Sequence, residues 1–290
     1  MFSTLTQYRD TAHYRTIKGL KIAYWRDELS EKAKDKPHLL LLHGFPSASY
    51  DWHLLWPDLA QHFRCHAFDF LGFGLSQKPY GHRYTLVEQA DIAQEYLRLE
   101  GITQCWLLAH DYGVSVAQEL LCRHDQYDFN IQQCAFLNGG LFADQHRPLL
   151  MQRLLKSILG PMIVPLLSKR SLHQSFTKIF APHTPPSAQL IDVLWELLKV
   201  NGGTKVIPAL LQYLDERAVY ATKWRETMLL QQQKLAFING VHDPISGKHM
   251  LEAFAACCPE ADTKSLNVGH YPQLEDAKAV YSALKEIWRL

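Results

Sequence analysis

The sequence predicts an α/β fold built on a mostly parallel sheet of eight strands, with helices on both faces and one helical insertion. Short, nearly solid apolar runs recur along the chain, and most of the later runs alternate with segments of helical periodicity. Strands that are apolar on both faces are typical of a parallel sheet covered by helices on each side. The alternation breaks once, between residue 140 and about residue 234, where no strand pattern is convincing.

The apolar runs predict the strands in order. They lie at residues 13–18, 21–25, 38–42, 65–70, 105–109, 134–138, 235–239 and 263–268. The first two strands are joined by Gly19 and predict an antiparallel hairpin at the sheet edge. A helix is expected over residues 88–99, because Thr85 is a suitable N-cap with Glu88 three residues later. A similar pattern over 271–290 predicts a helix at the end of the chain.

The break in the alternation predicts a helical insertion lying over the sheet. Amphipathic patterns at 147–159, 187–200 and 205–220 are separated by proline-rich segments at 160–165 and 181–186. The expected division is a core of residues 1–140 and 225–290, with residues 141–224 inserted between its two parts.

Composition excludes several classes of function. The 290 residues are 47% apolar, which is ample for a buried core, and 30 Lys and Arg residues nearly balance 29 Asp and Glu residues. Without a long run of either charge, the chain is expected to bind neither nucleic acid nor a membrane surface. Its longest apolar runs, at 39–42 and 162–167, are far shorter than the roughly 20 residues of a membrane span.

Location and cofactors are expected from what the sequence contains. Residues 1–14 mix polar and charged side chains, so they do not form the apolar segment of a secretory signal, and a cytoplasmic start is expected. Six cysteines in mostly apolar segments, without CxxC or Cys/His ligand spacing, predict reduced core thiols and no metal site. GxGxxG does not occur, and no cofactor is expected.

Polar residues gather directly after four of the predicted strands, where open parallel sheets place their reactive groups. These segments are HGFP at 43–46, HDYG at 110–113, GVHDP at 240–244 and VGH at 268–270. Ala109 and Gly113 flank Asp111 in the small-x-nucleophile-x-small form of a nucleophile elbow, between a strand and a helix. A carboxylate needs no base to be nucleophilic, so Asp111 is expected to attack saturated carbon and form an ester.

Hydrolysis of such an ester needs an activated water and an oxyanion site. Asp243 and His270 follow Asp111 in the order nucleophile, acid, histidine that this arrangement requires. The backbone N–H groups of Phe45 and Tyr112 are expected to form the oxyanion hole. Asp111 as a helix N-cap and Asp243 as an ordinary turn residue are the simpler alternatives.

The chain resembles the α/β-hydrolases of the epoxide hydrolase and haloalkane dehalogenase branch, and most closely the mesoderm-specific transcript protein family. The resemblance to this branch rests on the motifs HGFP, FDFLGFGLS at 68–76, AHDYG at 109–113, GVHDP and GHYPQLED at 269–276. The closer likeness is carried by SYDWH at 49–53, HDYGVSVAQELL at 110–121, NGGLF at 138–142, HRPLL at 146–150 and LLQY at 210–213. The resemblance implies the α/β-hydrolase fold, a helical cap formed by the insertion, and a small-molecule substrate that reacts with water.

The resemblance to haloalkane dehalogenases is incomplete at the leaving group. Those enzymes hold the halide with a Trp directly after the nucleophile and a second N–H donor. Here Tyr112 and Phe45 occupy the corresponding positions, which leaves Trp195 or Trp224 of the insertion as alternative donors.

The resemblance to epoxide hydrolases is closer but also incomplete. Those enzymes protonate the ring oxygen with two cap tyrosines. Tyr213 matches the second in context, and the first is missing unless Tyr220 or His146 replaces it. The sequence therefore favours an epoxide hydrolase-like enzyme acting on a small apolar substrate; a haloalkane dehalogenase-like enzyme and a non-catalytic ligand-binding module are the alternatives.

Two further assignments complete the expected site. The substrate pocket is expected to include Phe45, Tyr112, Phe142 and Trp195, although such aromatic residues are more often core. Ser115 also sits in a small-x-Ser-x-small segment, GVSVA at 113–117, as in serine hydrolases. To use Ser115, the strand would have to continue through poor strand formers, so Ser115 is interpreted as a small residue that packs the elbow helix.

Overall fold

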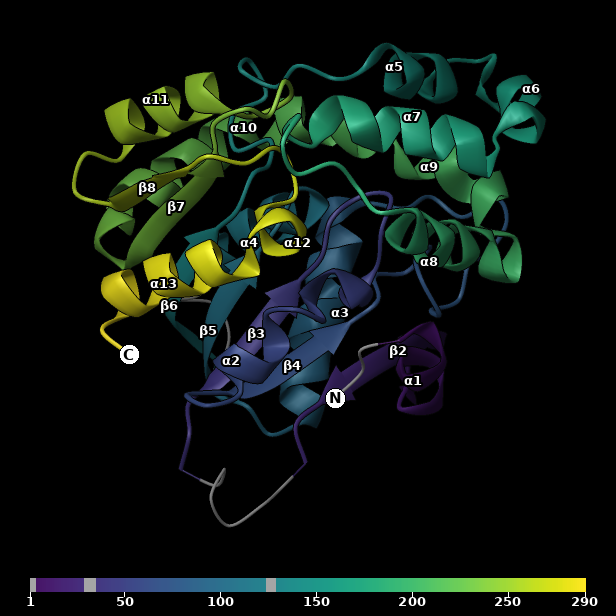
Figure 1. The fold of residues 1–290 in the computed structure, drawn as a ribbon. Coiled ribbons are helices and arrows are strands. Elements are labelled where there is room, and N and C mark those ends of the chain that lie inside the picture. Colours follow the sequence, from purple (N-terminus) through teal and green to yellow (C-terminus); the bar gives the residue numbers. More distant parts are fainter. Residues whose placement is uncertain (1–3, 29–34, 124–128) are drawn as a thin grey trace.

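The computed structural model describes residues 4–28, 35–123 and 129–290, so residues 1–3 of the expected cytoplasmic start lie outside the described residues. Its eight-stranded sheet has the order β1-β2-β4-β3-β5-β6-β7-β8 (Figure 1). The strands are β1 His13–Ile17, β2 Leu20–Arg26, β3 His38–Leu42, β4 Arg64–Phe68, β5 Gln104–Ala109, β6 Asn130–Phe136, β7 Leu235–Gly240 and β8 Asp262–Leu266. All neighbours from β4 to β8 pair in parallel, which confirms the predicted mostly parallel sheet.

The two N-terminal strands form the predicted antiparallel hairpin at the sheet edge. Ile17 pairs with Leu20 across a two-residue turn. Both turn residues have positive φ, 52° at Lys18 and 80° at Gly19, as the tight turn of a twisted hairpin requires.

The central strands are buried on both faces because their side chains alternate between two hydrophobic cores. Leu40 and Leu42 of β3 point into one core, whereas Leu39 and Leu41 point into the other. Burial on both faces explains why these strands read as solid apolar runs in the sequence.

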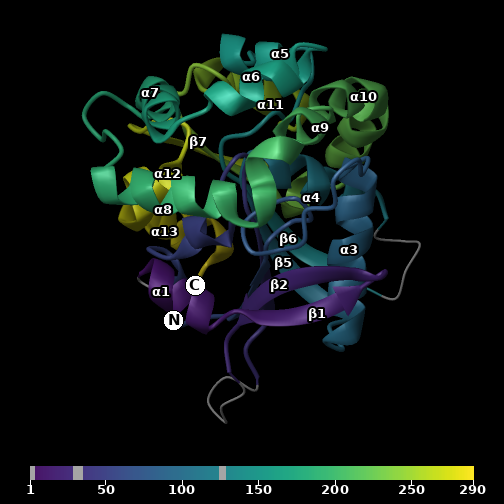
Figure 2. The same ribbon diagram turned by 90° about the vertical axis from the view of Figure 1, so that its right-hand side faces the viewer.

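Helices cover the two faces of the sheet, as Figures 1 and 2 show. On one face lie α3 Leu86–Leu99, α4 Tyr112–Cys122 and α11 Lys248–Cys257. On the other lie α1 Leu5–Asp10, the 3-10 helix η2 Ser49–Trp52, α2 Trp56–Leu59 and α13 Ala277–Trp288. Helix α3 is capped as predicted, because the Thr85 hydroxyl accepts the N–H of Glu88 at 3.1 Å.

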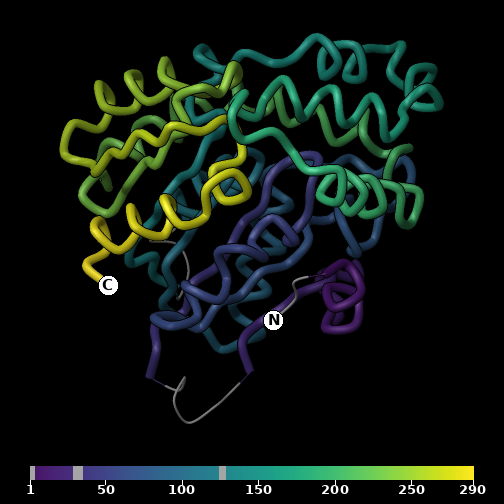
Figure 3. Tube along the Cα trace, viewed as in Figure 1, coloured from purple at the N-terminus to yellow at the C-terminus, as the bar shows by residue number. Residues whose placement is uncertain are grey.

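A long helical insertion separates β6 from β7, and the chain returns to the sheet through α10 (Figure 3). This insertion comprises α5 Leu150–Lys156, α6 Gly160–Ile163, η3 Val164–Leu166, α7 Lys169–Ile179, α8 Ala188–Lys199, η4 Val200–Val206 and α9 Ile207–Leu210. Helix α10 spans Tyr213–Leu230, and η5 Gln232–Lys234 precedes β7. The expected boundary at residue 224 thus falls inside α10, and the division into core and cap stays a prediction.

A separate hydrophobic cluster joins the insertion to the loops at the end of the sheet. Phe176 of α7 and Ile191 of α8 belong to a cluster that includes Ile245 and Tyr271 from the sheet side. The Tyr271 ring stacks on Phe176, with centroids 5.1 Å apart. The insertion is therefore held directly against the segment that contains His270.

Several elements differ from the sequence expectation. Strand β6 spans Asn130–Phe136 rather than the expected 134–138. Its first residues are mostly polar and pair with β5, so no apolar run in the sequence marks the start of the strand. The C-terminal helix is interrupted, with α12 Pro272–Glu275 followed by α13, whose N-cap is Asp276. Helix α7 was not expected, although Leu172, Phe176 and Ile179 lie on one helical face after a Ser168 cap. Among the described residues, no helix combines the length and apolar character needed to cross a bilayer.

Candidate active site

Asp111 lies at a sharp turn between β5 and α4, as the elbow pattern predicts. Its backbone has φ 45° and ψ −101°, a conformation that costs a non-glycine residue roughly 1–3 kcal/mol. Gly113 must be small, because a Cβ there would lie 2.3 Å from the Leu42 carbonyl oxygen. The turn therefore presents the Asp111 side chain beyond the carboxyl end of β5.

The Asp111 carboxylate is 3% exposed and has different neighbours at its two oxygens. Oδ2 accepts a hydrogen bond from the Phe45 N–H at 2.9 Å. Oδ1 lies 3.8 Å from Nε2 of His270 and 3.8 Å from Nη2 of Arg217. Burial raises the pKa of Asp111, but the charges of His270 and Arg217 outweigh it and hold that pKa below its usual value. An ionised carboxylate with one free oxygen is suited to nucleophilic attack.

His270 and Asp243 form the predicted pair. Nδ1 of His270 lies 2.7 Å from Oδ2 of Asp243. Asp243 also accepts hydrogen bonds from the N–H and hydroxyl of Ser246, at 3.1 and 2.6 Å, and from the Ile245 N–H at 2.7 Å. Burial raises the pKa of Asp243, but the His270 charge and these hydrogen bonds bring it down to about 2.

The charge on His270 depends on both carboxylates. Burial lowers the pKa of His270, but Asp243 and then Asp111 raise it to about 9. His270 is therefore cationic at neutral pH while Asp111 is ionised. If Asp111 became a neutral ester, one of the two carboxylate charges would be lost and the pKa of His270 would fall.

Asn138 links the loops that carry Asp243 and Asp111. Its side-chain N–H group lies 2.9 Å from Oδ2 of Asp243 and 2.9 Å from the Gly240 carbonyl. The backbone carbonyl oxygen of Asn138 accepts the N–H of Asp111 at 2.8 Å. A neutral amide can donate to Asp243, which a second carboxylate at this position could not do.

The His270 segment is fixed from several sides. Nε2 of His110, the residue before the predicted nucleophile, lies 2.7 Å from the His270 carbonyl oxygen. The His270 N–H donates to the Ile179 carbonyl of the insertion at 2.8 Å. The Glu275 carboxylate accepts the N–H groups of Gly269 and Tyr271 at 2.8 and 3.0 Å. Sequence reasoning did not identify His110 or Glu275 as supports of the site.

The predicted oxyanion groups lie beside Asp111. Phe45 donates its N–H to Oδ2, and the peptide bond between Phe45 and Pro46 is cis. Tyr112 is the first residue of α4, so its N–H is one of the amides at a helix N-terminus that have no acceptor within the helix. His43 supports this loop, since Nε2 lies 3.0 Å from the Phe70 amide nitrogen.

A narrow cavity of about 90 Å³ lies between the insertion and the loops of the sheet. Phe45 and His270 line it from the sheet side, and Trp195 of α8 lines it from the insertion, together with apolar residues and three serines of the α7 region. Two of the four expected pocket residues, Phe45 and Trp195, thus line the same cavity as His270, whereas Asp111 is not among its lining residues.

The other two expected pocket residues do not line this cavity. The Tyr112 ring packs against Phe73, with centroids 5.1 Å apart, and is not among the residues that line the cavity. Phe142 lies under Arg225 of α10, whose guanidinium carbon is 4.9 Å from the ring centroid. Phe142 lines a different hollow, together with Arg225 and Glu226 of α10, and its contact with substrate stays a prediction.

Tyr213, one of the leaving-group donors expected from the sequence, is buried but is not among the residues that line the cavity, whereas Trp195 is. The fully buried ring of Tyr213 lies 6.1 Å from Phe45 and 5.0 Å from Tyr112. Within the described structure its hydroxyl has no hydrogen-bond partner, and burial together with the Asp111 charge raises its pKa. Trp224 donates Nε1 to Glu119 at 3.0 Å, and Tyr220 packs on Trp224, so neither lines the cavity.

Sequence reasoning missed Arg217, a buried cation beside Asp111. Nη2 donates to the main-chain oxygen of Asp111 at 3.0 Å, and Nε donates to Oγ of Ser115 at 2.8 Å. Strand β5 ends at Ala109, so Ser115 is buried within α4 and does not lie at the turn that follows the strand. Arg217 lies one turn after Tyr213 on the same face of α10, but this spacing alone does not show that its charge is directed inward.

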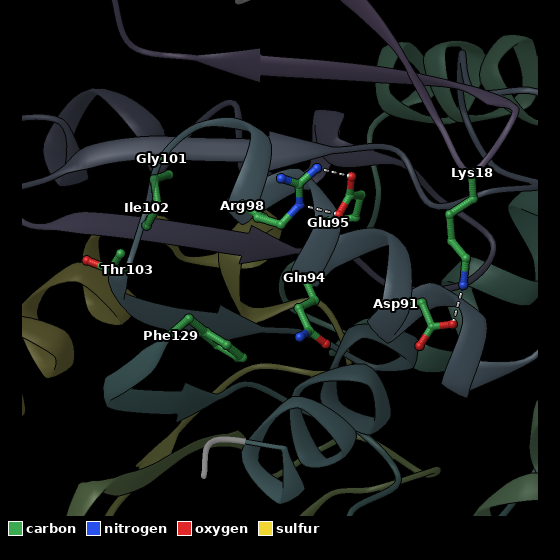
Figure 4. Close-up of a pocket in the computed structure, with 9 residues that line it drawn as sticks. All are labelled: Lys18, Asp91, Gln94, Glu95, Arg98, Gly101, Ile102, Thr103 and Phe129. Carbon is green, nitrogen blue, oxygen red and sulfur yellow. Dashed lines mark hydrogen bonds and ion pairs between the residues drawn. The ribbon is translucent and has the colours of Figure 1, made fainter. Parts of the chain in front are cut away.

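A larger hollow of about 500 Å³ lies at the opposite end of the sheet and contains none of the predicted site residues (Figure 4). Thr103 and Phe129, which line it, directly precede β5 and β6. In this hollow Lys18 forms an ion pair with Asp91 at 2.5 Å, and Arg98 forms an ion pair with Glu95 at 2.7 Å. The opposite charges within each pair offset each other.

Comparison with known proteins identifies relatives over most of the chain. The profile of the α/β hydrolase fold family matches residues 37–277. Mesoderm-specific transcript protein of Mus musculus is 37% identical over 291 residues, covering 96% of this chain and 86% of the mouse protein. The putative hydrolase LipZ of Mycobacterium tuberculosis is 36% identical over 252 residues, covering 86% and 87%.

Similarity in three dimensions agrees with the sequence matches. The crystal structure of haloalkane dehalogenase DbeA from Bradyrhizobium elkani superposes with a TM-score of 0.78 at 21% identity, covering 96% of this chain and 97% of that one. Shorter sequence matches extend to proteins named haloalkane dehalogenase and epoxide hydrolase 1. The resemblance to this branch, and to mesoderm-specific transcript protein in particular, is thereby confirmed.

Proposed function

The chain belongs to the α/β hydrolase fold family, and from that premise we propose that it hydrolyses a small apolar electrophile through an ester on Asp111. The observation that carries this proposal is the carboxylate at the elbow, with Oδ2 at the Phe45 N–H and Oδ1 facing His270. A serine at the same turn would form an acyl ester with a carbonyl compound. A carboxylate instead attacks saturated carbon and needs no base for that step.

The first step forms a covalent ester. Oδ1 of Asp111 attacks carbon, and the bond from that carbon to the leaving group breaks with its electron pair. For an epoxide, the leaving oxygen remains attached to the substrate and needs a proton. Tyr213, buried near Asp111 with its hydroxyl unpaired, is the proposed donor.

The second step hydrolyses the ester. His270, oriented by Asp243, removes a proton from water, and the hydroxide adds to the Asp111 carbonyl carbon. The N–H groups of Phe45 and Tyr112 stabilise the resulting oxyanion. Loss of the Asp111 charge in the first step is what frees His270 to act as a base, because it lowers the histidine pKa.

We favour an epoxide over a haloalkane because a buried hydroxyl donor is present and the usual halide donors are not. Tyr112 occupies the position after the nucleophile, and the Trp224 N–H is bound to Glu119. Trp195 lines the cavity, and this observation supports haloalkane dehalogenation as the second candidate. The cavity volume of about 90 Å³ supports a small substrate for either reaction.

A panel of chromogenic epoxides run beside a panel of haloalkanes tests the proposal. We expect turnover by the wild type, a loss of at least about 1,000-fold in Asp111→Asn, and unchanged turnover in Asp10→Asn, an exposed aspartate of α1. The better panel then identifies the substrate class. No turnover in either panel would contradict the proposal and favour a non-catalytic ligand-binding module.

A cytoplasmic location is proposed separately. All six cysteines are free in the structure, with four buried and two half-buried, which supports reduced thiols. Cell fractionation of the tagged chain, with a secreted protein as the reference, tests this location.

A further inference from the structure

We propose that Arg217, oriented by Ser115, is a positioning residue that favours negative charge on Oδ1 of Asp111 and so speeds breakdown of the ester rather than its formation. The inference rests on the proposed function. It assigns a role to a cap-side helix, α10, in the second half of the reaction.

Burial and charge single out Arg217. The residue is 2% exposed, and a buried guanidinium is costly unless its charge and its N–H groups are satisfied. Among the described residues, Asp111 is its only ion-pair partner, at 3.8 Å. Its other neighbours are uncharged: Oγ of Ser115, Nδ1 of His146 at 3.5 Å, and the Tyr213 ring at 4.6 Å.

The guanidinium is held in one orientation. Ser115 accepts the Nε hydrogen at 2.8 Å, and the main-chain oxygen of Asp111 accepts from Nη2 at 3.0 Å. On a third side, a Cβ at Gly140 would lie 2.3 Å from Nη1, so only glycine leaves room for the guanidinium there. These contacts direct Nη2 toward the nucleophilic carboxylate without placing Arg217 among the residues that line the cavity.

The two steps of the reaction change the charge on Oδ1 in opposite directions. In the first step, a lone pair of Oδ1 forms the bond to substrate carbon and the negative charge passes to the leaving oxygen. In the second, hydroxide adds to Cγ of Asp111 and the oxyanion forms on Oδ2, at the Phe45 N–H. On collapse, the bond from Cγ to Oδ1 breaks, and its electron pair goes to Oδ1, which departs with the substrate carbon and takes the proton from His270.

A fixed positive charge beside Oδ1 therefore acts differently on each step. It stabilises the resting carboxylate, which gives no advantage to ester formation, and it stabilises the charge that develops on Oδ1 during breakdown. An arginine keeps its proton throughout, so the effect is electrostatic rather than acid–base. Removing the charge should slow breakdown selectively and allow the ester to accumulate.

Single-turnover measurements on the intact chain separate the two steps. Enzyme is mixed with the best substrate of the epoxide or haloalkane panel, quenched at intervals, and the ester on Asp111 is followed by intact-protein mass spectrometry. For Arg217→Met we expect breakdown to slow about 10- to 100-fold while formation changes less than about 3-fold. Arg217→Lys should recover part of the loss, Ser115→Ala should show a smaller defect, and Arg225→Met on the same helix should behave as wild type.

The pH dependence of ester formation gives a second readout. Several charged or titratable groups interact with Asp111: His270, His110, His43, Asp51 and Tyr271 from the sheet side, His146 from the insertion, and Arg217 and Tyr213 from α10. Loss of Arg217 should move the acidic limb of ester formation to higher pH, since Asp111 would bind its proton more tightly. A residue that only braced the helix would leave this limb in place.

The outcomes distinguish this inference from the proposed function. Formation and breakdown slowed equally, with the acidic limb unmoved, would overturn the role of Arg217 while leaving the ester mechanism intact. A wild type that forms no ester with any substrate would overturn the proposed function, and this inference with it. Should Arg217→Met fail to fold, the same partition measured in Arg217→Lys and Ser115→Ala decides the question.

Discussion

Nε2 of His270 lies 3.8 Å from Oδ1 of Asp111, beyond hydrogen-bond distance, while Nδ1 of the same ring is bound to Asp243 at 2.7 Å. The His270 ring is thus held by Asp243 and faces Asp111 without being bonded to it. This separation suits a base that acts on a water molecule at the ester rather than on Asp111 itself.

Replacing His270 should stop the reaction after its first step. Because Asp111 needs no base to attack carbon, His270→Gln should still form the ester but should hydrolyse it at least about 1,000-fold more slowly. Intact-protein mass spectrometry should then show one substrate mass added per chain, located on Asp111 by peptide mapping. His183→Gln, an exposed histidine, is the matched control. Rapid turnover by His270→Gln would mean that another group activates the water.

Asp243 should set the pH range of ester hydrolysis. Asp243 is the main contributor that raises the His270 pKa to about 9, so Asp243→Asn should lower that pKa. A base works in its neutral form, so the hydrolysis rate should rise with pH through the His270 pKa of the ester, and this rise should begin at lower pH in the variant. The plateau rate should fall by about 1,000- to 10,000-fold, because the ring loses its orientation. Single-turnover rates between pH 5 and 10 measure both effects; an unshifted profile would contradict the pairing.

The same pKa predicts a pH-dependent stability. A histidine pKa raised from 6.5 to about 9 on folding stabilises the native state fully below pH 6.5, and this contribution is lost as pH rises to 9. The free energy of unfolding of the wild type, measured in urea, should therefore fall over this window by up to about 3 kcal/mol relative to His270→Gln. Parallel pH curves for the two proteins would show that the histidine is not charged in the native state.

Much of the fold and of the site could be predicted because it depends on local pattern. Strands β3 and β5 are buried on both faces and are therefore visible in the sequence as solid apolar runs. Phe45 follows the first of these strands and Asp111 the second, and both were predicted as site residues because reactive groups lie at the ends of parallel strands. Asp243 and His270 were expected on the same ground, and the structure brings them together.

What escaped prediction depends on contacts between distant segments. Arg217 is separated by 102 residues from Ser115, and nothing in a helical pattern shows that its charge turns inward. The Phe142 ring was expected to line the pocket, but Arg225 of α10 lies over it and it is not among the residues that line the cavity. Such outcomes are decided by how the insertion packs on the sheet, which periodicity alone does not specify.

Tyr213→Phe should separate a catalytic hydroxyl from a packing ring. The hydroxyl has no partner within the described structure, so its removal should leave Tm unchanged to within about 1 °C. Epoxide opening should slow about 100-fold or more, because the ring oxygen loses its proton donor, whereas a halide leaves without a proton and should be unaffected. Tyr220→Phe, one turn of α10 away from Arg217, should change neither reaction. Equal losses with both substrates would mean that Tyr213 shapes the cavity rather than donating a proton.

Gly113→Ala should show how tightly the elbow is built. A Cβ at this position would lie 2.3 Å from the Leu42 carbonyl oxygen and 2.8 Å from that of His43, and both are backbone atoms of the strand and loop beside the site. We expect a loss of about 2–3 kcal/mol in the free energy of unfolding, measured in urea. Gly81→Ala, at φ 74° with open space around it, should cost only about 1 kcal/mol, because it tests backbone conformation without crowding. If the two losses were equal, crowding at the elbow would not be the reason that residue 113 is glycine.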